Sequence, residues 1–327
     1  MHTVVTSPKK AVWKEILKLV AVKKDFMLAY FALAAVCVIW GTTYLALRIA
    51  VLHFPPFLYI ALRQTLAGVI IIGATLWLTQ VERPKLDYII RQAIAGFFMI
   101  SMGNGFVAWA EMYIPSGVAA IICSTMPVVV ILMNIAIHKE EKTNALILLG
   151  VGLGMLGIIL IFSEHIVEFS RREYLAGIVM TLLAVLGWAG GSIWIKRKNT
   201  QSNLYLNAGL QMLFGGLWLF PLSLLFDDYN RISWTGEVIY PFIYLVVFGS
   251  VIAYVAYSYA LRKLPMTLVS LYAYINPLVA VILGWLVLDE KLNGKIVIAF
   301  LITIGGIYLV NKGYQQIKEW RAAFSQR

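Results

Sequence analysis

Residues 26–47 read FMLAYFALAAVCVIWGTTYLAL, a run of apolar and small side chains without a charge. A membrane-spanning helix needs about 20 mainly apolar residues, so this run is long enough to cross the hydrocarbon core. Runs of similar length and character recur along the chain. The ten runs are 26–47, 57–79, 92–110, 117–137, 143–162, 174–195, 204–226, 238–261, 266–288 and 296–311. The sequence therefore predicts an all-α integral membrane protein with ten transmembrane helices.

The composition supports a chain that is solvated mainly by lipid. Hydrophobic residues make up 61% of the sequence and charged residues only 13%, whereas about a quarter of the residues of a soluble domain are charged. The two cysteines, Cys37 and Cys123, both lie inside apolar runs. This placement predicts neither a disulfide framework nor a metal site, and we expect no cofactor.

The net charge of +11 is better explained by membrane orientation than by nucleic-acid binding. No basic patch interleaved with aromatic residues accompanies the charge, so we expect no nucleic-acid partner. Most of the Lys and Arg residues lie in the two termini and in alternate connections between the runs. The positive-inside rule therefore predicts a multi-pass inner (plasma) membrane protein with both termini in the cytoplasm.

Two short segments flank the predicted spans. Residues 1–25 form a cytoplasmic N-terminal segment, in which Trp13 and Leu17 share one helix face and Lys14 and Lys18 another. This pattern predicts an amphipathic helix on the anionic inner leaflet, with a solvated leader as the alternative. Residues 312–327 form a cytoplasmic C-terminal tail.

The chain contains an internal repeat at an offset of 148 to 150 residues. The matched pairs are Trp40 and Trp188, Gly68 and Gly216, Pro115 and Pro265, Pro127 and Pro277, Val129 and Val279, Glu140 and Glu290, and Gly157 and Gly306. The repeat divides the chain into a first five-helix unit, residues 26–163, and a second, residues 174–311. Because each unit has an odd number of spans, the second enters the membrane from the opposite side. Inverted repeats of this kind are typical of secondary transporters.

Several short motifs resemble one known family. They are Pro55-Pro56 followed by Arg63, YIPSGVA at residues 113–119 leading to Pro127, AYSYALRKLP at residues 256–265 leading to Asn276-Pro277, and LDEK at residues 288–291. With the repeat, they are similar to the EamA-type exporters of the drug/metabolite transporter (DMT) superfamily, over about residues 26–311. The resemblance implies a central cavity between two inverted halves, and a role in the export of amino acids or other metabolites.

The expected function is therefore secondary transport of a small organic metabolite, such as an amino acid, by alternating access. A membrane receptor or scaffold without transport is one alternative. An intramembrane enzyme is another, although the spans contain no acidic pair and no His-Glu-x-x-His motif. We expect no enzymatic activity, a small-molecule substrate, the lipid bilayer as surroundings and a monomer, with a dimer as the alternative.

Polar and aromatic side chains deep in the spans are the candidates for a substrate cavity. A polar atom in the membrane interior needs a hydrogen-bonding partner, which a cavity or a neighbouring helix can supply. Large aromatic residues can also serve packing alone. The candidates are Trp40, Asn104, Ser124, Trp188, Tyr254, Tyr257, Tyr274 and Asn276.

Two matched prolines, Pro127 and Pro277, are the candidate hinges. Each removes a helix hydrogen bond and frees the carbonyl four residues earlier, at Cys123 and Ala273. Freed carbonyls at equivalent depth in two inverted helices suit a cavity wall or a gate. A static kink is the alternative.

Two charged residues, Arg63 and Glu111, are predicted within or beside the spans. A charge in the membrane costs about 2.5 to 3.5 kcal/mol on insertion scales, so Arg63 needs a partner. It could contact an anionic substrate group or tie the second span to its neighbours, and we favour the structural role. Glu111 could serve proton coupling or face the lipid headgroups, and we favour the second reading.

Glycines occur at helix spacing in the fifth and tenth spans. Gly150, Gly154 and Gly157 share a stripe in the fifth span, and Gly305 and Gly306 lie in the tenth. Small residues let transmembrane helices approach closely. We expect these two spans to join the halves, with homodimerisation as the alternative.

Overall fold

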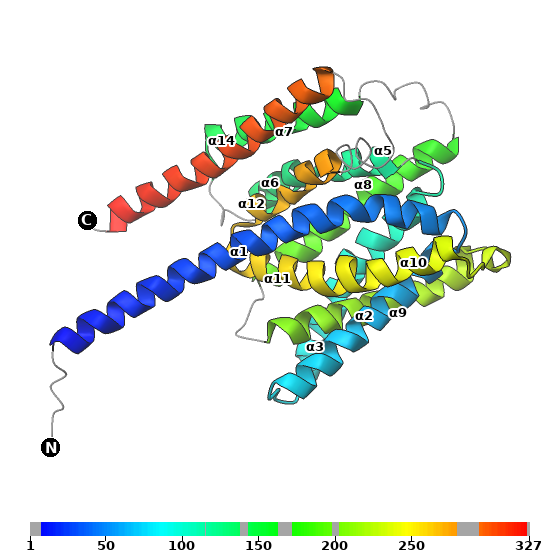
Figure 1. The fold of residues 1–327 in the computed structure, drawn as a ribbon, viewed down its shortest axis with the longest axis horizontal. Coiled ribbons are helices and arrows are strands. Elements are labelled where there is room, and N and C mark those ends of the chain that lie inside the picture. The colour runs from blue at the N-terminus through cyan, green and yellow to red at the C-terminus, as the bar shows by residue number, and fades with distance from the viewer. Residues whose placement is uncertain are drawn as a thin grey trace.

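The structure is a computed structural model that describes residues 8–114, 116–137, 143–162, 172–197, 203–279 and 294–325. Every regular element in these ranges is a helix (Figure 1). In chain order they are α1 (Pro8–Val51), α2 (Pro56–Leu78), α3 (Leu86–Gly96), η1 (Phe97–Gly105), α4 (Phe106–Ala110), α5 (Ser116–Cys123), α6 (Met126–Ile137), α7 (Ala145–Phe162), α8 (Arg172–Arg197), α9 (Leu204–Phe226), η3 (Tyr229–Arg231), α10 (Gly236–Tyr244), η4 (Leu245–Ile252), α11 (Ala253–Lys263), α12 (Met266–Ser270) and α14 (Gly294–Ser325). Residues 272–279 are also helical.

The predicted spans coincide with these helices. Of the described helical stretches, seven are long and apolar enough to cross a membrane. Two shorter apolar helices, Ala145–Gly157 and Met266–Val279, fall in the predicted fifth and ninth spans. The predicted fourth span consists of α5 and α6, with a turn at Ser124 and Thr125 between them. The prediction of an all-α membrane fold is confirmed.

The first and last helices extend beyond the predicted spans. Helix α1 is one helix of 44 residues, so the segment before residue 26 continues into the first span without a break. Helix α14 likewise runs past residue 311 to Ser325. The N-terminal end of α1 and the C-terminal end of α14 project from the same side of the molecule (Figure 1). The placement of the N-terminal segment on the membrane surface stays a prediction.

The equivalent helices α2 and α9 pack against each other in opposite directions. The carboxylate of Asp227, directly after α9, accepts the backbone N–H groups of Phe57 and Leu58 at the start of α2 (3.4 and 2.8 Å). At the other end Asn203, the N-cap of α9, donates to Thr79 just after α2 (3.4 Å). Partial burial raises the pKa of the Asp227 carboxyl, and the hydrogen bond from Leu58 opposes that shift. The two capped ends show that the halves are inverted.

The fifth and tenth spans, α7 and α14, form a second antiparallel pair through their glycines (Figure 1). A Cβ atom on Gly306 would lie 2.5 Å from the carbonyl oxygen of Gly150, so the two backbones are in direct contact. Near one end of the pair, Asn144 donates to the carbonyl oxygen of Gly313 (3.1 Å). The predicted joint between the halves is confirmed for these glycines. Gly305 does not take part, because a Cβ atom there would meet nothing within 4 Å.

The third and eighth spans each contain a π-helical stretch, which the sequence did not predict. These stretches, η1 and η4, interrupt spans that begin and end as α-helix. Leu245, the first residue of η4, is related to Phe97, the first of η1, by the same offset that relates Trp188 to Trp40. A π-helical turn widens the helix and often marks a functional site. The repeat has therefore preserved an irregular backbone in both halves.

Some predicted features lie outside the described residues. They are Pro115, Glu140, Glu290 and the LDEK motif at residues 288–291.

Candidate functional site

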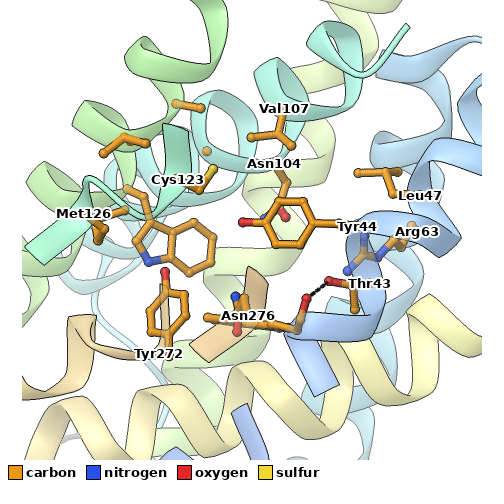
Figure 2. Close-up of a pocket in the computed structure, with 15 residues that line it drawn as sticks. Thr43, Tyr44, Leu47, Arg63, Asn104, Val107, Cys123, Met126, Tyr272 and Asn276 are labelled. Atoms are coloured by element: carbon orange, nitrogen blue, oxygen red, sulfur yellow. Dashed lines mark hydrogen bonds between the residues drawn. The ribbon is translucent and has the colours of Figure 1, made fainter. Parts of the chain in front are cut away.

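A cavity of about 80 Å³ lies in the interior of the bundle (Figure 2). The residues that line it are Trp40, Thr43, Tyr44, Leu47, Arg63, Gly103, Asn104, Val107, Cys123, Met126, Ala184, Val185, Trp188, Tyr272 and Asn276. They come from both halves: the first, second, third, fourth, sixth and ninth spans. A cavity needs about 10 to 15 Å³ of such space to hold one water, so this volume has room for several waters. We expect the cavity to widen when it admits a cargo.

Arg63 brings a positive charge to the edge of the cavity, beside Thr43 and Tyr44 (Figure 2). Its Nε donates to the hydroxyl of Ser250 in η4 (2.9 Å). This bond ties the second span to the π-helical stretch of the eighth span. Arg63 therefore joins two helices, as the favoured structural role predicts, and it also lines the cavity, whereas its contact with an anionic substrate group stays a prediction.

An aromatic cluster closes one end of the cavity. The repeat-related Trp40 and Trp188 meet edge to face, with ring centroids 5.3 Å apart. Tyr257 lies 5.2 Å from Trp40 and accepts a hydrogen bond from Nε1 of Trp188 (3.1 Å). Nε1 of Trp40 donates to the carbonyl oxygen of Gly249 in η4 (2.9 Å). The aromatic cluster consists of Trp40, Trp188, Tyr254, Tyr257 and Tyr272.

A smaller pocket of about 20 Å³ lies beyond the aromatic cluster. It is lined by Met99, Ile195, Lys196, Leu204, Asn207, Gln211, Ser258, Leu261 and Arg262. Tyr254 of the aromatic cluster donates to Gln211 of this pocket (2.7 Å). Gln211 is related to Arg63 by the same offset that relates Trp188 to Trp40. The small pocket therefore contains the position that matches Arg63, and its Ile195 matches Leu47 of the cavity in the same way.

Each half also contains a basic side chain that holds the loop after its third span. Nη1 of Arg48, near the end of α1, donates to the carbonyl oxygen of Ile114 (2.7 Å). Nζ of Lys196, near the end of α8, donates to the carbonyl oxygen of Leu264 (2.5 Å). Both pairs occupy matched repeat positions, each acceptor directly preceding one of the repeat-related prolines. We name these contacts the Arg48 latch and the Lys196 latch.

The two latches lie at opposite ends of the bundle. Arg48 lies at the far end of α1 from its N-terminus. Leu264 directly follows Lys263, whose ammonium pairs with Asp25 at the start of the first predicted span (2.7 Å). The Lys196 latch is thus on the side where the first span begins, and the Arg48 latch is on the other side.

The structure brings together four of the eight predicted cavity residues. Trp40, Asn104, Trp188 and Asn276 line the cavity. With its amide nitrogen facing them, Asn276 donates to the carbonyl oxygens of Cys37 (3.1 Å) and of Tyr272 (2.9 Å).

The other four predicted residues do not line the cavity. Tyr254 and Tyr257 lie within the aromatic cluster, and Ser124 is buried in the turn between α5 and α6. Tyr274 points to the fifth span, where its hydroxyl donates to the carbonyl oxygen of Val151 (2.9 Å).

Sequence reasoning missed one face of α1. Thr43, Tyr44 and Leu47 line the cavity with Trp40 and follow it by three, four and seven residues. This spacing is that of one helix face, so it could have been recognised from Trp40. Tyr254 and Tyr257 were the candidates from the eighth span, and no described residue of that span lines the cavity. The first and sixth spans contribute more residues than the predicted Trp40 and Trp188, and the second span contributes Arg63.

The candidate hinge prolines lie close to real breaks in their helices. Pro127 is the second residue of α6, directly after the turn at Ser124 and Thr125. Proline is tolerated there because its missing N–H would have no helical acceptor. In the second half the break is at Leu271, and Pro277 lies within helical residues 272–279. The hinge role of both prolines stays a prediction.

Glu111 is fully buried, so the expectation that it faces the headgroups is wrong. Glu111 is the first residue of the turn that follows α4, and the neighbouring residues Ala110 and Ile114 are buried with it. Neither carboxyl oxygen of Glu111 has a hydrogen-bonding partner in the described part of the chain.

The fold and the site define a class of protein. An all-helical membrane protein with two inverted halves around a central cavity is built as secondary transporters are. The model of the EamA-like transporter family matches residues 27–163 and 175–312, and the chain belongs to this family. The protein is therefore a multi-pass inner membrane transporter and not an enzyme.

Relatives and a solved structure agree with this assignment. The uncharacterized inner membrane transporter YedA of Escherichia coli strain K12 is 32% identical over 286 residues, which cover 85% of this chain and 91% of YedA. Protein PecM of Dickeya dadantii is 26% identical, with 86% of this chain and 91% of PecM covered. A protein of known crystal structure matches the fold with a TM-score of 0.72 at 18% identity, covering 88% of this chain and 98% of that one.

Proposed function

We propose that the protein exports a small organic metabolite, such as an amino acid, by alternating access through the central cavity. The observation that carries this proposal is the pair of pockets on the two sides of the aromatic cluster, one lined by Arg63 and the other by Gln211 at the matched repeat position. An inverted repeat can exchange the conformations of its halves, which would enlarge one pocket while the other closes. We interpret the structure, in which both latches are formed, as a state closed toward both sides.

The chemistry of the cavity supports a zwitterionic or amphipathic cargo. Arg63 supplies a positive charge that can bind a carboxylate, and guanidinium groups bind carboxylates with two parallel hydrogen bonds. Asn104 and the hydroxyls of Thr43 and Tyr44 supply further hydrogen-bonding groups. The aromatic cluster offers an apolar surface and can contact a cation through its ring faces.

The orientation in the membrane belongs to the same proposal. Both termini face the cytoplasm, because the basic residues concentrate on the side of the termini. The cavity beside the Arg48 latch then opens to the outside, and the small pocket beside the Lys196 latch opens to the cytoplasm. Impermeant thiol labelling of intact cells tests this orientation, since a cysteine in the cavity should react and one in the small pocket should not.

Flux in proteoliposomes tests the function directly. Vesicles that contain the purified protein are loaded with a radiolabelled mixture of the common amino acids, and efflux is followed against empty vesicles. We expect protein-dependent efflux that falls in Asn104→Leu, because this change removes a hydrogen-bonding group from the cavity. Binding of the label without efflux would instead indicate a receptor.

A further inference from the structure

Glu111 stands out because it is a buried acid with no partner. It is 0% exposed, and both of its carboxyl oxygens lack a hydrogen-bonding partner in the described part of the chain. An ionised carboxylate in such a place loses its hydration and gains nothing in return, whereas a neutral carboxylic acid loses much less. The geometry therefore favours the protonated form while Glu111 is enclosed.

The groups around Glu111 connect it to the cavity and to the Arg48 latch. The charges of Arg48 and Arg63 both act on the Glu111 carboxyl, but neither forms an ion pair with it among the described residues. Tyr44 and Cys123, which line the cavity, also interact electrostatically with Glu111. Glu111 thus acts electrostatically on two residues of the cavity wall without lining the cavity itself.

The Arg48 latch explains why the carboxyl has no partner. The guanidinium of Arg48 donates to the carbonyl oxygen of Ile114, three residues after Glu111, and not to the carboxylate itself. Opening of the latch would free Arg48 and admit water beside Glu111. Water and a free guanidinium both stabilise a carboxylate, so opening favours loss of the proton.

The second half has no equivalent acid. The position that matches Glu111, four residues before the repeat-related proline, is Leu261. The Lys196 latch therefore lacks a neighbouring carboxyl at this place. A carboxyl at this repeat position is therefore present beside the Arg48 latch and absent beside the Lys196 latch.

We propose that Glu111 is a proton-binding site of the gate held by the Arg48 latch. It binds one proton when this gate closes and releases it to the water of the same side when the gate opens. A high proton concentration on that side consequently favours the closed gate. The proposal deepens the proposed alternating access, and it rests on the gate that this mechanism requires.

Thiol labelling tests the proposal without a known cargo. Cys37 and Cys123 are replaced with Ala and Asn104 with Cys, and a small impermeant thiol reagent is added at a series of external pH values. The same cysteine is labelled in Glu111→Gln, which cannot ionise, and in the control Glu82→Gln, an exposed loop acid. Comparison at equal pH cancels the effect of pH on the thiol itself.

We expect the parent protein to label progressively faster than Glu111→Gln as the external pH rises, because deprotonation of Glu111 opens the gate. Glu82→Gln should follow the parent protein at every pH. A ratio of parent to Glu111→Gln labelling that does not change with pH would overturn the proposal. This measurement does not use amino-acid efflux. A failure of the Glu111 proposal can therefore be distinguished from a failure of the proposed export function.

Infrared spectroscopy gives a second measurement that does not depend on gate opening. The closed protein should show a carboxylic-acid C=O band that shifts on deuteration, disappears in Glu111→Gln and persists in Glu82→Gln. If Glu111→Gln fails to fold, Glu111→Asp should move the band instead. A spectrum in which no such band depends on Glu111 would contradict a protonated carboxyl.

Discussion

Arg63 and Ser250 show how a buried charge is held at the scale of single residues. The guanidinium is only 4% exposed and donates from Nε to the Ser250 hydroxyl across two spans. A hydrogen bond to a charged group contributes about 1.5 to 3 kcal/mol, more than a bond between neutral groups. The contact therefore stabilises the packing of α2 against η4 as well as the position of the charge.

Replacing Ser250 with Ala should lower the free energy of unfolding by about 1.5 to 3 kcal/mol, because Arg63 loses the acceptor of its Nε proton. Thermal unfolding of the purified protein in detergent measures the change. Ser258→Ala is the matched control, since Ser258 is half-buried in the same span and makes no side-chain hydrogen bond in the described part of the chain. If both variants lost the same unfolding free energy, the hydrogen bond between Arg63 and Ser250 would not be what stabilises the protein at this place.

The repeat predicted which site residues lie together, whereas the direction of single side chains could not be predicted from the sequence. Trp40 and Trp188 occupy matched positions, so two inverted halves bring them together near the centre. Tyr274 was assigned to the cavity from its depth alone, but its hydroxyl meets the fifth span. Glu111 was misjudged because its position at the end of the third span does not reveal that the folded chain buries it.

At the scale of helices, contact between α7 and α14 depends on which face each glycine presents. The neighbouring residues Gly305 and Gly306 illustrate this, because a Cβ atom on Gly306 would lie 2.5 Å from the carbonyl oxygen of Gly150 and one on Gly305 would meet open space. Backbone atoms cannot give way as the end of a flexible side chain can. The same substitution at these two positions should therefore have opposite effects.

Gly306→Ala should force α7 and α14 apart and reduce the yield of monodisperse protein, by an overpacking cost of about 1 to 3 kcal/mol. Gly305→Ala should leave the yield unchanged or raise it slightly, since alanine favours helix over glycine by up to about 1 kcal/mol. Size-exclusion chromatography of fluorescent fusions measures both. A loss in Gly305→Ala as large as that in Gly306→Ala would contradict the observed interface.

The sequence predicted the helices well and their internal irregularities poorly. Long apolar runs and the odd number of spans per repeat were sufficient to predict the helical spans and their inversion. Seven of the described helical stretches are long and apolar enough to cross a membrane, and the antiparallel pair α2 and α9 agrees with the inversion. The π-helical stretches η1 and η4 have no comparable hydrophobicity pattern in the sequence, because a π-helical turn differs from an α-helical turn by about one residue. Residues of η4 also make contacts with distant parts of the chain, as Gly249 does with Trp40 and Ser250 with Arg63. The helix ends of α1 and α14 were missed because helix can continue beyond the bilayer into water.

At the scale of the whole molecule, the two latches are equivalent contacts on opposite sides. Arg48 holds the carbonyl of Ile114 and Lys196 that of Leu264, at 2.7 and 2.5 Å. A transporter that alternates must be able to open either side while the other stays closed. Latches of matched geometry give the two sides comparable stability, so the loss of one should bias the molecule toward opening on that side.

Removing a latch should shift access in a direction set by which latch is lost. Arg48→Gln should raise labelling of Asn104→Cys in the cavity from the outside. Lys196→Gln should lower that labelling and raise labelling of Asn207→Cys in the small pocket from the cytoplasmic side. Loss of a charge-assisted hydrogen bond of about 1.5 to 3 kcal/mol corresponds to a shift of about ten- to a hundredfold in the equilibrium between the two open states.

Side-specific labelling in a background without Cys37 and Cys123 measures these shifts in oriented membrane vesicles. Reciprocal changes are the decisive result, because alternating access links the opening of one pocket to the closing of the other. Local loosening would instead raise labelling beside the altered latch and leave the far side unchanged. If both variants raised labelling of both cysteines, the latches would stabilise the bundle as a whole, and the pockets would not be two ends of one alternating pathway.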